Sequence, residues 1–243
     1  MKHTTTNFFV PPENIQNGRV IFPQEESHHL AKVLRAGVDD EVIVVDGAGK
    51  TYHVIITRAD KEFSRGEIKG EAIATPEPVI EFTMCLGAIK PKQLEWAWDA
   101  CVQLGISRLI PIHADYGIER IRPDGKFFER LEIVAIRAMK QSRRAFLPQV
   151  EPPKTVHEII AEKRYDHLII ADENGLPNFP VNLPKLGEKV WLFVGPEGGF
   201  SADERKAVSN AGGVPVSLGQ RRLRAETAAI ALSTIALRWT GDI

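Results

Sequence analysis

Cysteine is scarce in this chain: Cys85 and Cys101 are the two in 243 residues. They lie sixteen residues apart on what read as separate elements, which is neither a disulfide framework nor the spacing of metal ligands. The adjacent histidines His28 and His29 lack companions that would complete a metal site. We therefore expect two buried thiols and no metal.

Long apolar runs are missing as well. No segment reaches the roughly 18 consecutive apolar residues of a membrane span, and the stretch MKHTTTNFFVPPENIQ has no apolar core of signal length. Polar low-complexity runs are also absent, and 43% hydrophobic with 26% charged residues is an ordinary globular composition. These features predict a cytoplasmic protein without a membrane attachment or extended disorder.

The chain as a whole has no excess of positive charge, since its net charge is −1 at pH 7. Basic residues cluster instead in two short segments, RAMKQSRR (137–144) and GQRRLR (219–224). Such clusters are typical of nucleic-acid contacts. Taken alone, each is explained at least as well by a solvated helix face or loop.

A proline-containing stretch, AIATPEPVIEF (72–82), divides the chain into two predicted domains. Before it, two β-rich runs between Glu41 and Arg58 are joined by Gly-Ala-Gly, a hairpin signal, and RGEIKGEAI supplies a further strand. A short helix is expected over SHHLAKVLR (27–35), with Ser27 as its N-cap. Residues 1–72 are thus predicted to form a small β-barrel-like domain.

Strand and helix patterns alternate in residues 73–243. Strands are expected in EFTMCLGAI, SRLIPI, HLIIAD, VWLFV and VPVSL. Besides the helix described next, one long helix is expected from about Lys126 to Arg143, and others in TVHEIIAEK, SADERKAVSNAG and AETAAIALSTIALRW. In KQLEWAWDACVQLG, residues recur at helical spacing before Gly105: Leu94, Ala97, Trp98, Cys101 and Leu104. The alternation predicts an α/β fold class, with a mainly parallel sheet covered on both faces.

Two loops of this domain are unusual. LFVGPEGGFSADE (192–204) runs from an apolar strand into Gly195, Gly198 and Gly199, which allow close approach of a ligand to main-chain amides. Ser201 and Glu204 have the spacing of a capping box. Because the loop is neither a P-loop nor G-x-G-x-x-G, nucleoside triphosphates and dinucleotides are not supported, and a tight turn without a ligand explains it equally well.

The second loop, SLGQRRLRAET (217–227), places a glycine and three arginines before the last helix. Ligands of α/β sheets bind outside the carboxyl ends of the strands. Both loops follow predicted strands, so we expect them at one edge of the sheet.

Four segments in combination closely resemble the RsmE family over nearly the whole chain. They are FVGPEGGFSADE, LGQRRLRAETAAI, QSRRAFLP and HHLAKVLRAGVDDEVIVVDGAGKTY. These are SPOUT-class RNA methyltransferases that use S-adenosylmethionine to methylate N3 of a uridine in 16S rRNA of the small ribosomal subunit. The resemblance implies a PUA-like RNA-binding barrel (1–72), a SPOUT α/β trefoil-knot domain (73–243) and a homodimer.

The resemblance also implies that residues 194–199 and 218–224 form the walls of the S-adenosylmethionine pocket. Side chains there would block the ligand, which accounts for the glycines. Leu218 and Leu223 would contact adenine, with ordinary core packing as the alternative. The implied cofactor-binding residues are Val194, Gly195, Pro196, Glu197, Gly198, Gly199, Leu218, Gly219, Leu223 and Arg224.

Methylation at N3 requires loss of a weakly acidic imide proton and stabilisation of charge on O2 and O4. Arg224 is the candidate for holding the uracil or stabilising that charge, against a phosphate or helix-terminus contact. Glu226 is either a base or an orienting partner of Arg224, with the structural role favoured. Glu197 is expected to accept backbone hydrogen bonds. The proton acceptor and the target nucleotide stay open.

RNA contacts are predicted at two helix ends, because their residue types bind phosphates and ribose hydroxyls. The residues are His29, Lys32 and Arg35 near the N-terminus, and Gln141, Ser142, Arg143 and Arg144 at the end of the long helix. The slightly negative net charge predicts modest affinity for naked RNA, strong salt dependence and a preference for an assembled ribosomal particle.

Three positions depart from the family pattern. Ala100 and Gln103 replace the charged residues of Lys-x-x-Glu-Leu-Gly, and Arg222 stands where an apolar residue commonly precedes Leu-Arg. Two rival functions remain: a non-catalytic rRNA-binding assembly factor and a SPOUT methyltransferase acting on tRNA. A Rossmann-type methyltransferase is not supported, because CLGAIKPKQ is not the required glycine-rich loop.

Overall fold

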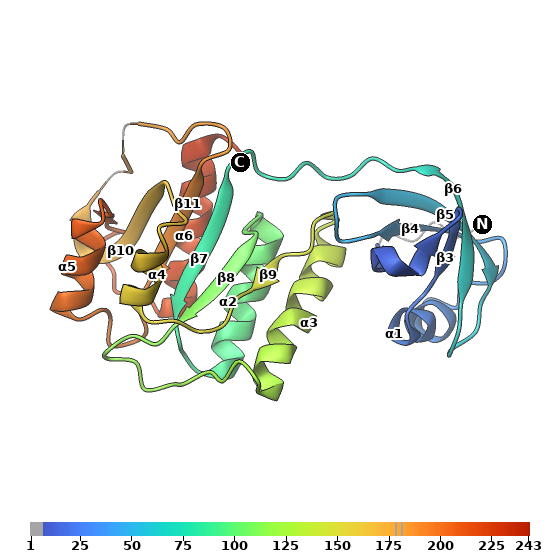
Figure 1. The fold of residues 1–243 in the computed structure, drawn as a ribbon, viewed down its shortest axis with the longest axis horizontal. Coiled ribbons are helices and arrows are strands. Elements are labelled where there is room, and N and C mark those ends of the chain that lie inside the picture. Colours follow the sequence, from blue (N-terminus) through green and yellow to red (C-terminus); the bar gives the residue numbers. More distant parts are fainter. Residues whose placement is uncertain (1–6, 178, 181) are drawn as a thin grey trace. The chain divides into compact units, whose positions relative to one another are not determined.

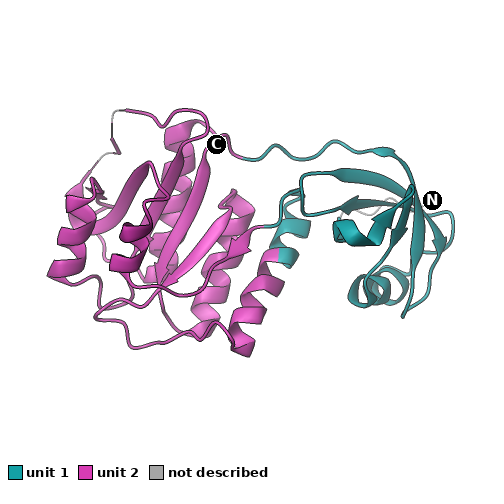
Figure 2. Cartoon of the chain, in the orientation of Figure 1, with its two compact units in different colours: residues 1–77, 136–147 teal, residues 78–135, 148–243 magenta. Residues whose placement is uncertain are grey.

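The computed structural model describes residues 7–177, 179–180 and 182–243 (Figure 1). They fall into two compact units, residues 1–77 with 136–147 and residues 78–135 with 148–243 (Figure 2). The first unit thus includes a segment from much later in the chain. No helix in the described ranges combines the length and apolar character needed to cross a bilayer.

A six-stranded sheet in the order β1-β4-β5-β6-β3-β2 forms the first unit. Its strands are β1 (Phe8–Phe9), β2 (Ile15–Gln16), β3 (Arg19–Ile21), β4 (Glu41–Val45), β5 (Thr51–Arg58) and β6 (Arg65–Glu71), and a 3₁₀ turn, η1, spans Pro12–Asn14. The predicted hairpin is confirmed, since β4 and β5 pair antiparallel with Val45 opposite Thr51. Val42, Val44, Val54 and Ile56 point into the core of this unit.

The short N-terminal helix begins earlier than the sequence predicts. Helix α1 spans Gln24–His28 and continues into a π-helical turn, η2, over His29–Val33. Ser27 therefore lies inside the helix, and its prediction as N-cap is wrong. Its buried hydroxyl donates to the Phe22 carbonyl (3.1 Å) and accepts from the Ser64 amide (2.9 Å). A serine with a distant backbone partner and a capping serine look alike in sequence.

Six parallel strands in the order β12-β10-β11-β7-β8-β9 form the sheet of the second unit. They are β7 (Glu81–Gly87), β8 (Arg108–Ile112), β9 (Gln149–Val150), β10 (His167–Leu176), β11 (Lys189–Val194) and β12 (Val214–Val216). The predicted parallel sheet is confirmed. Strand β10 continues to Leu176, beyond the predicted end at Asp172.

Helices cover both faces of this sheet (Figure 1). They are α2 (Pro91–Leu104), α3 (Lys126–Gln141), α4 (Val156–Glu162), α5 (Ala202–Asn210) and α6 (Ala225–Thr240). Residues of α4 and α5 join Cys85, Ile110 and Phe193 in one core cluster. Helix α6 lies against β7 and β11 on the other face, where α2 packs on it. Coverage on both sides explains the almost entirely apolar strands.

Helix α2 follows the predicted pattern and ends at Gly105, which has a φ of 120°. Leu94, Ala97, Trp98 and Cys101 are buried as expected, whereas Leu104 is half-buried. Both thiols are free and buried, which confirms the prediction for the cysteines. Burial raises the pKa of Cys101 to about 12, so this thiol stays protonated at neutral pH.

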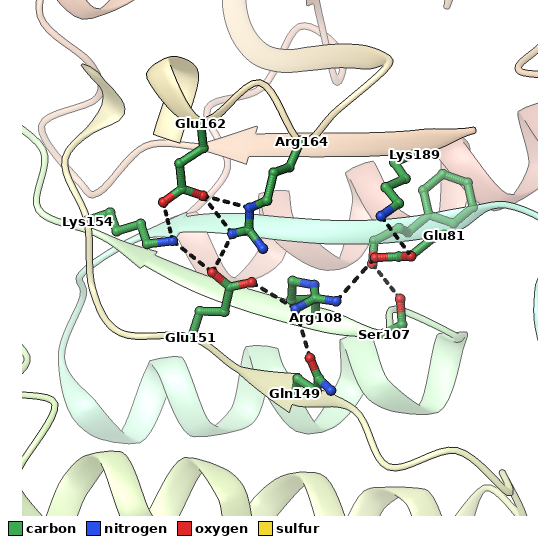
Figure 3. Close-up of polar contacts among 10 residues, drawn as sticks. Glu81, Ser107, Arg108, Gln149, Glu151, Lys154, Glu162, Arg164 and Lys189 are labelled. Carbon is green, nitrogen blue, oxygen red and sulfur yellow. Dashed lines mark hydrogen bonds and ion pairs between the residues drawn. The ribbon is translucent and has the colours of Figure 1, made fainter. Parts of the chain in front are cut away.

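Charged residues fasten the amino ends of the strands in the second unit (Figure 3). Arg108, the first residue of β8, pairs with Glu151 at 2.8 Å, and Glu151 also pairs with Lys154 (2.8 Å) and Arg164 (2.6 Å). The network further includes Glu81, Gln149, Glu162 and Lys189. It ties together the starts of β7, β8 and β11 and the segment after β9, leaving the opposite edge to loops.

The network predicts a specific loss of stability in acid. Burial alone raises the pKa of the Glu151 carboxyl, but hydrogen bonds from Arg164 and Lys154 and the charge of Lys154 outweigh it and lower that pKa to about 2. The ordinary value is 4.5. Since the folded-state pKa is depressed, this stabilisation is present above about pH 4.5 and is lost as the pH falls toward 2.

We expect the free energy of unfolding to fall more steeply between pH 4.5 and 2 in the wild type than in Glu151→Gln. Urea unfolding at a series of pH values measures it. Glu132→Gln, on the exposed face of α3, is the matched control and should keep the wild-type slope. Superimposable pH profiles for Glu151→Gln and the wild type would contradict the prediction.

Candidate functional site

A cavity of about 580 Å³ opens in the second unit at the carboxyl edge of its sheet. This volume lies within the range of about 300–1,000 Å³ typical of small-molecule sites. Three segments line it: residues 171–174 of β10, residues 194–200 with Arg205 after β11, and residues 218–228 after β12, where the lining positions are 218, 219, 221–225 and 228.

The two loops that the sequence singles out are brought together here. All ten residues implied as cofactor-binding line the cavity: Val194, Gly195, Pro196, Glu197, Gly198, Gly199, Leu218, Gly219, Leu223 and Arg224. Residues of β10 form a third wall that the sequence analysis does not identify, including Asp172, Glu173 and Asn174. The polar stretch directly after the apolar residues of that strand is the signal that points to it.

The loop between β11 and α5 is held by the predicted capping box. The Ser201 amide donates to Glu204 Oε2 (2.8 Å), and the Glu204 amide donates to Ser201 Oγ (3.1 Å). Asp115, in the loop after β8, adds a second clamp: it accepts from Ser201 Oγ (2.6 Å), and its amide donates to Glu204 Oε1 (3.1 Å). The wall therefore has a fixed shape before any ligand binds.

The backbone geometry of the cavity loops requires glycine at several positions even without a ligand. Gly199 and Gly219 have φ values of +69° and +111°, which other residues adopt only with strain. A Cβ on Gly198 would lie 2.9 Å from Tyr116 Cβ, and one on Gly195 would lie 3.0 Å from the Gly199 backbone. Access for a ligand, the reason offered by the sequence, is therefore not the sole constraint.

Gly87, the last residue of β7, is a site residue that sequence reasoning missed. A Cβ there would lie 2.3 Å from Pro196 N and 2.8 Å from Gly195 C. The end of the central strand thus supports the cavity loop by direct backbone approach. A glycine closing an otherwise apolar strand is the signal that marks it.

Arg222 links all three walls of the cavity. Its Nη2 donates to the Glu197 carbonyl (3.1 Å), and its Nε lies 3.7 Å from Glu173 Oε1. Both charged side chains are 77% exposed, so the ion pair contributes little to stability. This arginine, a departure from the family pattern, connects the walls at a solvent-exposed position. Glu197 takes part through its main-chain oxygen. The predicted hydrogen bonds from backbone amides to its carboxylate are not seen among the described residues.

Arg224 and Glu226 have different surroundings. Arg224 is the N-cap residue of α6, lines the cavity and is exposed. Within the described part of the chain, its guanidinium has no hydrogen bond or ion pair, so it is available to a ligand. Glu226 is 8% exposed, in the first turn of α6 and outside the cavity lining. Its position favours the role of a carboxylate at a helix start.

The residues predicted to contact RNA all fall in the first unit. Lys32, Arg35, Gln141 and Arg143 are exposed. His29 is half-buried with its ring 5.6 Å from that of Phe8, and burial together with the charges of Lys140 and His28 lowers its pKa. Helix α3 ends at Gln141, before the predicted end at Arg143, and the Ser142 hydroxyl just after it donates to the Ala138 carbonyl of its last turn (2.8 Å).

Arg144 does not fit its predicted role in RNA binding. It is 4% exposed, and its Nε donates to Glu77 Oε2 at 2.9 Å. Lys140 forms an ion pair with Glu26 in the same unit. These two pairs hold residues 136–147 in the first unit. A partner 67 residues earlier in the chain leaves no local signal in the sequence.

Family models match both parts of the chain. An RNA methyltransferase domain matches residues 75–237, and an RNA methyltransferase PUA domain matches residues 22–69. The first covers well over half of the chain, so it establishes the family. The predicted fold class, a SPOUT-type α/β trefoil-knot domain with a small N-terminal PUA-like domain, is thereby confirmed.

Curated relatives and solved structures agree. Ribosomal RNA small subunit methyltransferase E of Aquifex aeolicus is 27% identical, covering 93% of this chain and 97% of its own length. The enzyme of the same name from Neisseria gonorrhoeae, solved bound to S-adenosyl methionine, has a TM-score of 0.86 at 26% identity, covering 99% of this chain and 100% of that one. A probable rRNA methyltransferase from Porphyromonas gingivalis has a TM-score of 0.83 at 28% identity, covering 98% and 99%. The chain belongs to the RsmE family of RNA methyltransferases.

Proposed function

We propose that this protein transfers a methyl group from S-adenosylmethionine to N3 of a uridine in 16S rRNA of the small ribosomal subunit. The observation that carries the proposal is the cavity whose walls are GPEGGF and LGQRRLR. Relatives that are small-subunit rRNA methyltransferases by name, matched over nearly their full length, support the same substrate class.

The cavity suits S-adenosylmethionine in size and lining. Leu218 and Leu223 offer apolar surface to an adenine ring, and the main chain of residues 195–199 offers amides and carbonyls to polar groups. A Cβ added to Gly199 or Gly219 meets no protein atom within 4 Å, so both walls border open space. When bound, S-adenosylmethionine supplies a methyl group on a positively charged sulfur.

Arg224 contributes the electrostatic part of the reaction. The free guanidinium at the cavity favours the anionic form of the uracil imide by balancing the charge on O2 and O4. The N3 proton passes to solvent, directly or through a carboxylate of the cavity lining (Asp172, Glu173 or Glu197), because arginine remains protonated and Glu226 lies outside that lining. The site would hold the uracil anion against bound S-adenosylmethionine, and methyl transfer would form the N3–carbon bond as the sulfur–carbon bond breaks and the neutral thioether leaves.

The first unit provides the RNA-binding surface in this proposal. The predicted PUA-like domain, residues 1–72, presents Lys32 and Arg35, and Arg143 is a further exposed cation of the same unit. We place the protein in the cytoplasm as a homodimer, in keeping with the family resemblance.

The departures on α2 leave its fold intact. Gln103 Nε2 donates to Asp99 Oδ2 at 2.7 Å, so a neutral amide that binds a carboxylate stands where the family commonly has a charged side chain. Ala100 is half-buried on the same helix. Neither residue lines the cavity, so both changes leave the proposed methyl-donor site unaffected.

The test is incubation of the purified protein with radiolabelled S-adenosylmethionine and small subunits that lack the modification, beside naked 16S rRNA and tRNA. We expect labelled 3-methyluridine from the subunits, little from naked 16S rRNA and none from tRNA. Label in tRNA would show that the substrate is tRNA and not 16S rRNA. Cofactor binding by calorimetry without label in any RNA would instead support a non-catalytic assembly factor.

A further inference from the structure

The loop after β8, residues 113–125, carries exposed apolar side chains at the carboxyl edge of the sheet. Tyr116 is 58% exposed and Ile118 is 94% exposed. Folding does not explain such side chains, because exposure of large apolar surface gives no stabilisation. A loop with this composition beside a cavity is therefore a candidate contact surface.

The start of this loop is fixed in place. Asp115 is bound to Ser201 and Glu204 at the cavity loop, and the Gly117 amide closes a turn on the Ala114 carbonyl (3.0 Å). Farther along, the Ile121 amide donates to His113 Nε2 (3.2 Å), and Arg120 donates to the Gly117 carbonyl (2.7 Å). Tyr116 thus projects from a preorganised support.

Tyr116 lies directly against the wall of the cavity. A Cβ added to Gly198 would meet Tyr116 Cβ at 2.9 Å and the Tyr116 carbonyl oxygen at 3.1 Å. Gly198 itself lines the cavity. The contact uses the Cβ and the main chain of Tyr116, so the phenol ring is not needed to shape the wall.

Neither the ring nor the hydroxyl of Tyr116 has a partner among the described residues. Other aromatic side chains of this unit do: Tyr165 packs on Trp191 (5.6 Å), and Phe193 packs on Phe200 (6.4 Å). A rigidly supported, solvent-facing aromatic ring offers a flat surface at little entropic cost on binding.

We propose that the Tyr116 ring is a stacking platform for an unpaired nucleobase of the RNA substrate beside the methyl-donor cavity; this inference rests on the proposed function. A base that reacts at N3 must leave its pairing and stacking, and aromatic side chains replace the lost stacking. Exposed arginines border the site, namely Arg120 and Arg122 in the same loop and Arg221 and Arg224 at the cavity. Acidic side chains lie among them, in the loop and at the cavity, so the choice of RNA rests on the exposed ring beside a cavity of the RNA methyltransferase domain and not on net charge.

Tyr116→Ala tests the proposal without disturbing the wall, because alanine keeps both atoms that touch Gly198. We expect kcat/KM for methylation of small subunits to fall about tenfold or more, the scale of losing one stacked base. Tyr116→Phe keeps the ring and should retain wild-type activity. The affinity for S-adenosylmethionine, measured by calorimetry, should be unchanged in both variants.

Ile118→Ala is the matched control in the same loop, since it removes exposed apolar surface without an aromatic ring. Wild-type kcat/KM in Tyr116→Ala would overturn the proposal. So would an equal loss in Ile118→Ala, or a parallel loss of cofactor affinity. A change of oligomeric state in sedimentation would place the ring in a subunit interface and overturn the proposal as well.

A second readout separates this inference from the proposed reaction. Single-stranded RNA containing 2-aminopurine loses fluorescence when that base stacks on an aromatic ring. We expect quenching by the wild type and by Tyr116→Phe and a loss of quenching in Tyr116→Ala, even if the wild type methylates a different RNA. Equal quenching by all three proteins would overturn the stacking role.

Discussion

Replacing Arg224 by alanine is expected to lower kcat for methyl transfer by about 10²–10³-fold, the scale of removing one charge-stabilising donor from an active site. Arg224 lines the cavity with a guanidinium that is free of partners in the described part of the chain. Its loss leaves the developing charge on the uracil carbonyl oxygens without a counter-ion. Arg224→Lys should recover only part of the rate, because an ammonium cannot make a bidentate contact.

Single-turnover methylation of small subunits measures this effect, with cofactor affinity followed separately by calorimetry. Affinity within about tenfold of the wild type would show that the loss lies in the chemical step. Arg238→Ala, an exposed arginine in the last turn of the same helix, is the control and should leave the rate unchanged. A wild-type rate in Arg224→Ala would remove this residue from the mechanism.

Gly87→Ala should weaken cofactor binding by more than tenfold and destabilise the second unit by about 1–3 kcal/mol, the typical cost of overpacking. The added Cβ would lie 2.3 Å from Pro196 N and 2.4 Å from Pro196 Cδ. Backbone cannot move aside as a flexible side chain does, so the GPEGGF loop must shift. Calorimetry of cofactor binding and urea unfolding measure the two effects.

Gly70→Ala is the matched control for this substitution. Gly70 lies in strand β6, and a Cβ there meets no atom within 4 Å. This variant should bind the cofactor as the wild type does. If Gly87→Ala also bound normally and kept the wild-type stability, the close approach of β7 to the cavity loop would not matter in solution.

Local patterns carried most of what the sequence could predict. The apolar spacing from Leu94 to Cys101 and the glycine after it fixed α2, because these signals act within one or two helical turns. The capping box of Ser201 and Glu204 likewise placed the start of α5. The two cavity loops could be recognised because each carries an unusual run of glycine or arginine next to a strand.

Features that depend on distant partners could not be predicted. Ser27 pairs with Ser64 and Arg144 with Glu77, so neither shows its true role to a reading of neighbouring residues. The same holds for Asp115, which clamps Ser201 from 86 positions away. Sequence patterns predict what a residue type can do, whereas long-range pairing decides what it does.

The strand order of the second unit has a consequence for the synthesis of the protein. Strand β7 hydrogen-bonds to β11, with Glu81 opposite Lys189, which is made 108 residues later. At roughly 5–20 residues per second, one edge of an apolar strand waits about 5–20 s for its partner. Such an edge invites pairing with other chains, so the nascent polypeptide should need protection by chaperones. The arginine-rich segment that forms one wall of the cavity is also made late. A chain that is truncated before this segment lacks that wall and is inactive.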